Sequence, residues 1–182
     1  MKITSIINYC TYNQLFINKC IESLQCVSDK VIVTYCTHFY DGTNENYDLI
    51  NQTINRYPNV KFVEIEYIPD QLDTSRCLNS RLIGMNYVDT DTDYLLFADS
   101  DEVLIVDRFF KFLESDKFVS GNDYTLVSYW YFRDVKYQSK NYETSLCFIK
   151  YPLCPKEINP SHDRGSLFAS QPLYCDYNSL PV

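Results

Sequence analysis

The sequence predicts an α/β protein with three layers, α/β/α, in which helices cover both faces of a central, mostly parallel sheet. Short apolar runs alternate with helical patterns through the first hundred residues, which is typical of a doubly wound parallel sheet. The 182 residues are 46% apolar, enough for one hydrophobic core, and the four glycines leave little room for flexible linkers. We therefore expect a single domain over residues 1–182.

Four apolar runs in the first half are short enough for buried strands. They lie at residues 2–8, 31–33, 60–67 and 94–98. The turn dipeptide Asp41-Gly42 follows the second run, and Pro58 separates the third from the helix before it. We expect these runs to pair as parallel strands, with a ligand crevice at their carboxyl ends.

The segments between these strands carry apolar residues at three- and four-residue spacing, which predicts helices. They cover residues 13–24, 46–56 and 74–87. Asn13 can cap the first of them with its short polar side chain. Further along, a helix capped by Asp107 is expected at 103–114, and strands rich in β-formers are expected at 124–132 and 145–151. The tail from Pro152 onward shows no clear period.

The charge and the cysteines restrict the partners and the compartment. A formal charge of −8 argues against a nucleic-acid or anionic-membrane partner, since both need clustered Lys and Arg. No apolar run has the length of a transmembrane segment, and the first residues form a strand pattern rather than a signal peptide. The eight cysteines are scattered. We interpret them as reduced thiols in a cytoplasmic protein, with a disulfide framework as the alternative.

The strongest chemical signal lies at the end of the fourth expected strand. Asp99, Asp101 and Glu102 follow its apolar run within four residues. Carboxylates this close repel one another, and a divalent cation between them would turn the repulsion into binding. The alternative is a solvated Asp-Ser turn that caps the next helix. The cluster therefore predicts a site for a metal-bound phosphate. Glu102 is expected to support the metal ligands without binding the metal itself, or to lie at the start of the next helix.

Three further segments precede this cluster along the chain. They are Thr11-Tyr12-Asn13 after the first strand, Ser23-Leu24 at the end of the first helix, and Ser80-Arg81-Leu82-Ile83-Gly84 in the third helix. With the D-x-D strand end, their order and approximate spacing resemble the GT-A fold, family 2-like glycosyltransferases. The resemblance covers residues 3–110. It implies a GT-A (Rossmann-like) fold in which residues 1–102 bind a nucleotide-sugar and residues 103–182 face the acceptor.

The resemblance also implies roles at the phosphate end of the site. Asp101 would ligate Mn²⁺ or Mg²⁺, and Asp99 would contact the donor's ribose or complete the metal shell. Arg81 would approach the diphosphate, because a guanidinium suits its oxygens. The bound cation would neutralise the departing diphosphate.

At the base end, the resemblance implies that Tyr12 stacks on the nucleotide base while Thr11 and Asn13 bond its edges. Family members also place an acidic base contact after the second strand, but here no carboxylate occurs before Asp41. Either Asp41 or Thr34 makes the contact, or the base differs. A UDP-sugar is the favoured donor, with a GDP-sugar or another nucleotide as the alternative.

We thus predict a metal-dependent, inverting glycosyltransferase that moves a sugar from a nucleoside-diphosphate sugar to a glycan or other hydroxyl acceptor. A carboxylate beyond the D-x-D strand would deprotonate that hydroxyl, and Asp163, beside His162, is the candidate. One alternative is a non-catalytic glycan-binding scaffold with a degenerate transferase fold. The other is a nucleotidyltransferase, disfavoured because no glycine for a phosphate loop precedes Gly42.

Overall fold

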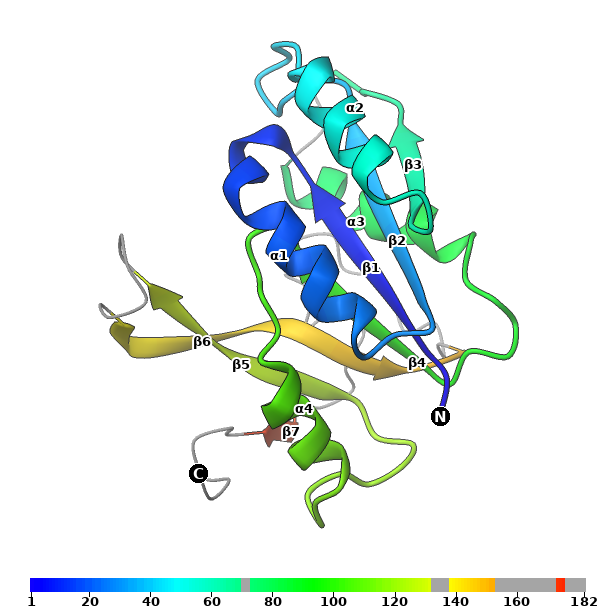
Figure 1. The fold of residues 1–182 in the computed structure, drawn as a ribbon, viewed down its shortest axis with the longest axis vertical. Coiled ribbons are helices and arrows are strands. Elements are labelled where there is room, and N and C mark those ends of the chain that lie inside the picture. Colours follow the sequence, from blue (N-terminus) through cyan, green and yellow to red (C-terminus); the bar gives the residue numbers. More distant parts are fainter. Residues whose placement is uncertain (70–72, 132–137, 153–172, 176–182) are drawn as a thin grey trace.

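The structure, a computed structural model, describes residues 1–69, 73–131, 138–152 and 173–175 (Figure 1). Its strands are β1 (Ile3–Tyr9), β2 (Lys30–Cys36), β3 (Lys61–Ile65), β4 (Tyr94–Asp99), β5 (Tyr124–Tyr131), β6 (Gln138–Lys150) and β7 (Leu173–Cys175). Its helices are α1 (Gln14–Gln25), α2 (Tyr47–Arg56), α3 (Asp73–Met85) and α4 (Val106–Leu113), and a 3₁₀ turn covers Thr11–Asn13. These elements confirm the predicted mixed α/β class.

The strands form one sheet in the order β3-β2-β1-β4-β6-β5-β7. The first four are parallel, with Ile6 of β1 between Ile32 of β2 and Phe97 of β4. β6 runs antiparallel to both β4 and β5, so the sheet continues directly from the first half of the chain into the second. Because β1 to β4 are parallel, their carboxyl ends meet at one edge of the sheet.

Helices cover both faces of this sheet (Figure 1). On one face Ile17 of α1, Ile50 of α2 and Phe109 of α4 join the same hydrophobic cluster. On the other face Ile83 of α3 packs against Ile6 and neighbouring strand residues. Alternate strand residues feed the two clusters, as the two-residue period of a strand requires. Within the described ranges, none of the helices is long and apolar enough to cross a bilayer.

Two predicted helix caps differ from the structure. Asn13 precedes α1 without capping it, because its amide instead donates to Ser100 Oγ at 3.2 Å. Asp107 lies inside the first turn of α4, which begins at Val106 rather than at residue 103. By contrast Asn46 caps α2, since its side chain accepts the N–H groups of the two residues at the second and third helical positions.

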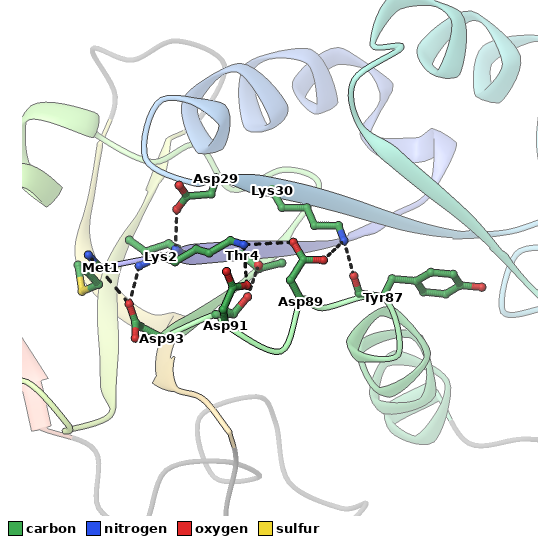
Figure 2. A network of polar contacts seen from close by, with 11 residues as sticks. Met1, Lys2, Thr4, Asp29, Lys30, Tyr87, Asp89, Asp91 and Asp93 are labelled. Atoms are coloured by element: carbon green, nitrogen blue, oxygen red, sulfur yellow. Dashed lines mark hydrogen bonds and ion pairs between the residues drawn. The ribbon is translucent and has the colours of Figure 1, made fainter.

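At the opposite edge, aspartates of the loop before β4 bind lysines at the start of β1 and β2 (Figure 2). Lys2 Nζ lies 2.6 Å from Asp91 Oδ1, and Lys30 Nζ lies 2.6 Å from Asp89 Oδ1. Asp93 also accepts the backbone N–H of Lys2 at 2.7 Å. Hydrogen bonding to Lys2 lowers the pKa of Asp91. These contacts fasten β4 to β1 and β2 far from the carboxyl edge.

Candidate functional site

A cavity of about 570 Å³, a size typical of small-ligand sites, opens at the carboxyl edge of the parallel strands. The ends of β1 to β4, the loop after β2 and one side of α3 line it. Its aromatic wall consists of Tyr12, His38, Phe39, Tyr40 and Tyr67. Its carboxylates are Asp41, Glu45, Glu66, Asp99 and Asp101. Among the residues whose side chains the structure describes, no Lys or Arg lines it.

The β4 end presents Asp99 and Asp101 to this cavity from a tight turn. Glu102 closes the turn, because its carboxylate accepts the N–H of Asp99 at 2.7 Å and its own N–H donates to the Asp99 carbonyl at 3.0 Å. Ser100 is buried and its N–H donates to the carbonyl of Asn8 on β1. The two aspartates therefore project from a backbone held to the adjacent strand, and Glu102 stabilises the turn.

Arg81 of α3 lies beside Asp99 and does not line the cavity. Its side chain is 3% exposed and donates from Nη2 to Asp99 Oδ1 at 2.8 Å, while a third of the Asp99 side-chain surface is exposed. Within the described part of the chain, the buried Nε of Arg81 has no hydrogen-bond partner. The arginine thus fixes and partly neutralises one of the two carboxylates.

The turn after β1 places Tyr12 at the cavity with 77% of its surface exposed. Its ring lies 4.4 Å from the ring of Phe39, between centroids, at 35°. Asn13 lines the cavity as well, but Thr11 is buried beneath the turn. The three residues therefore lie together, with Tyr12 presenting an aromatic face to a ligand.

The two residues considered for the acidic base contact have different surroundings. Thr34 is fully buried, and its hydroxyl bonds the Ile7 carbonyl at 3.1 Å and the Ser80 hydroxyl at 2.7 Å. Asp41 lines the cavity and accepts the hydroxyl of Thr43 at 2.6 Å and its N–H at 2.9 Å. These hydrogen bonds, the one from the hydroxyl above all, lower the pKa of Asp41. Of the two, only Asp41 can reach a ligand in the cavity.

Glu45 is a cavity residue that the sequence interpretation missed. It is 5% exposed, and its carboxylate accepts both the N–H and the hydroxyl of Thr11. Burial raises its pKa, although the bonds from Thr11 act in the opposite direction. The signal in the sequence was a second carboxylate four residues beyond Asp41, just before α2.

Two cysteines at strand ends, Cys10 and Cys36, also line the cavity. Burial raises the pKa of the Cys10 thiol, with Glu45 adding to the effect, so this thiol stays protonated at neutral pH. Every cysteine whose side chain the structure describes is a free thiol. This state agrees with the expectation of reduced cysteines.

The predicted catalytic base, Asp163, lies outside the described residues. In the described ranges there is no group of three or more His, Cys, Asp or Glu side chains that could hold a metal by themselves. Asp99 and Asp101 still fit a hard cation, because Mg²⁺ and similar ions bind through one or two carboxylates and complete their shell with water and substrate phosphates.

A comparison with protein-family models and with curated proteins gives no match for this chain. Among solved structures, PcManGT, a mannosyltransferase from Pyrobaculum calidifontis in complex with GDP-Man and Mn²⁺, shares 12% identity at a TM-score of 0.45, over 70% of this chain and 35% of its own. A 4-diphosphocytidyl-2C-methyl-D-erythritol synthase shares 10% identity at a TM-score of 0.49, over 81% of this chain and 74% of its own. The glycosyltransferase GlyE of Streptococcus pneumoniae TIGR4 shares 13% identity at a TM-score of 0.40, over 81% of this chain and 33% of its own.

This chain therefore spans about a third of the length of those two glycosyltransferases. The cavity itself has two chemically different parts. Its aromatic wall lies toward β2 and β3, and Asp99 and Asp101 lie at the end of β4. The site is thus a cavity of small-ligand size, with aromatic rings along one side and two carboxylates at one end.

Proposed function

We propose that this chain is a metal-dependent glycosyltransferase that moves a sugar from a nucleoside-diphosphate sugar to a hydroxyl of a glycan or other acceptor, with inversion. The observation that carries the proposal is the charge of the cavity: five lining carboxylates, and neither Lys nor Arg among the described lining residues. A diphosphate would be repelled from such a site. A divalent cation held by carboxylates reverses this repulsion.

The residues divide into two groups by the part of the donor that each would hold. Asp101 would ligate Mn²⁺ or Mg²⁺, and Asp99 would complete the metal shell or bond the ribose. The bound cation would stabilise the negative charge that develops on the departing diphosphate. Arg81 would keep Asp99 oriented through their 2.8 Å ion pair while adding positive charge near the phosphates.

At the other end, Tyr12 would stack on the base, and Asn13 and Thr11 would hold the turn that presents it. Asp41 remains the candidate for accepting an N–H of the base. Asp163 remains the candidate for the general base that takes the acceptor's proton. We place the protein in the cytoplasm, because the free thiols suit a reducing compartment.

Calorimetric titration with UDP and with GDP, each with and without Mn²⁺, tests this proposal. We expect one nucleotide to bind only when Mn²⁺ is present, and Asp101→Asn to abolish that binding. Asp107→Asn, an exposed aspartate in α4 away from the cavity, is the matched control and should bind as the wild type does.

A hydrolysis assay with the corresponding nucleotide-sugar, which measures the released nucleoside diphosphate, then separates an enzyme from a binding protein. Metal-dependent binding without any hydrolysis or transfer would favour the non-catalytic scaffold. Failure of every nucleoside diphosphate to bind the wild-type protein in the presence of Mn²⁺ would refute the proposed donor site.

A further inference from the structure

The loop between β2 and α2 contains a small hairpin that carries His38, Phe39 and Tyr40 of the aromatic wall. The N–H of Phe39 donates to the Thr43 carbonyl at 2.8 Å, and the N–H of Gly42 donates to the Phe39 carbonyl at 3.0 Å. Gly42 at the tip adopts φ +83°, a conformation that favours glycine. The hairpin carries the Phe39 ring to within 4.4 Å of the Tyr12 ring.

Glu45 lies at the base of this hairpin and joins it to the turn that carries Tyr12. Its backbone N–H donates to the Thr37 carbonyl at 2.9 Å, which closes the hairpin. Its carboxylate accepts the Thr11 N–H, at 3.1 Å from Oε2 and 3.3 Å from Oε1, and also the Thr11 hydroxyl. One buried side chain therefore connects two walls of the cavity that are 34 residues apart in sequence.

From these contacts we infer that Glu45 is a positioning residue, which holds the hairpin against the Thr11 turn and so sets the shape of the base-binding end. The inference rests on the proposed function, because it concerns how the same cavity receives its nucleotide. A carboxylate suits this task because two donors of Thr11 point away from water, and hydrogen bonds to a charged acceptor are the stronger ones.

The burial of Glu45 supports a functional reason for its presence. Burial raises its pKa, which means that the folded protein disfavours its charged form despite the two Thr11 donors. A carboxylate that is buried in a cleft at such a cost is a candidate for function. Asp99, in contrast, is fixed by Arg81 and Glu102, so the metal end has its own supports.

These separate supports predict a selective loss. Without the carboxylate, the hairpin is released from the Thr11 turn, and Tyr12 and Phe39 lose their fixed spacing. The end of β4 keeps its contacts. A nucleotide uses both ends of the cavity, whereas inorganic pyrophosphate with Mn²⁺ uses only the metal end.

The experiment compares Mn²⁺-dependent binding of UDP, GDP and inorganic pyrophosphate to the wild type, Glu45→Ala and Glu45→Gln by calorimetry. We expect Glu45→Ala to weaken the preferred nucleotide at least about tenfold, the loss typical of a charge-assisted hydrogen bond. Pyrophosphate affinity should stay within about twofold, since no contact at the metal end is removed. Glu45→Gln keeps an acceptor for Thr11 and should recover much of the lost nucleotide affinity.

Glu64→Ala on β3 is the matched control, because it removes an exposed carboxylate that does not line the cavity. Thr11→Val removes one of the two donors without a change in charge, and it should produce the same selective loss if Glu45→Ala does not fold. Unchanged nucleotide affinity, or equal losses for nucleotide and pyrophosphate, would overturn the inference. If the wild-type protein binds no nucleoside diphosphate, the result would instead refute the proposed function on which this inference rests.

Discussion

The ion pair between Arg81 and Asp99 should respond very differently to the loss of each partner. Asp99→Ala leaves the Arg81 side chain, which is 3% exposed, without its carboxylate partner. Breaking a buried pair from one side costs about 3 to 5 kcal/mol, and we expect about 3 because Asp99 is partly hydrated. Arg81→Met leaves a carboxylate that is a third exposed, so water can replace the guanidinium.

The methionine also removes the buried Nε of Arg81, which has no partner among the described residues. The loss of the hydrogen bond to Asp99 costs about 1.5 kcal/mol. Removal of the buried, unpaired Nε offsets about 1 kcal/mol of this, because its desolvation cost disappears. We expect Arg81→Met to change the free energy of unfolding by less than about 1 kcal/mol. Urea unfolding measures the free energy of unfolding of both variants, provided that the m value stays constant. In thermal unfolding, Asp99→Ala should lower Tm by about 6 to 12 °C.

Arg56→Met is the control, since its guanidinium is more than half exposed and its pair with Glu22 lies on the surface. We expect no measurable change there. Equal destabilisation by Arg81→Met and Asp99→Ala would refute the reasoning, because it would show that the exposure of the remaining partner does not decide the cost.

Two further variants test the wall and the sheet packing. Because burial raises the pKa of Glu45, its contribution to stability is present in acid and is lost as pH rises through the folded-state pKa. Glu45→Gln should therefore gain stability relative to the wild type as pH rises above about 4.3, the ordinary pKa of a glutamate, in urea titrations, and a constant difference would contradict this. Gly84→Ala places a Cβ 2.8 Å from Ile6 Cγ2 and should cost about 1 kcal/mol net of its helix propensity, whereas stabilisation would show that α3 shifts freely.

The layers of the fold were predictable because burial alone dictates the periods of strands and helices. Alternate residues of β1 feed opposite cores, with Ile6 on one side and Ile7 on the other. Helix starts were less predictable, because a polar side chain near a helix can find a better partner elsewhere. Asn13 was expected to cap α1, but its amide reaches Ser100, which is 87 residues away.

The candidate site was predictable only where a motif is local. Asp99 and Asp101 lie within three residues of each other and directly after a strand, so their shared position at the cavity followed from the sequence. The contact between Glu45 and Thr11 depends on how the hairpin folds back across the sheet edge. No spacing along the chain encodes that approach, and a carboxylate in a polar loop looks the same whether it is solvated or buried.

The acidic residues around the cavity therefore have different tasks, although they look alike in the sequence. Glu102 accepts the N–H of Asp99, Glu45 accepts two donors of Thr11, and Asp99 pairs with Arg81. Each contact fixes the backbone or side chain of a neighbour whose own position matters to the ligand. The proposed cation site would need such fastening, because repulsion between its carboxylates would otherwise spread them apart. The geometry around Asp101 thus depends on residues that, in the proposed site, need not touch the metal or the nucleotide.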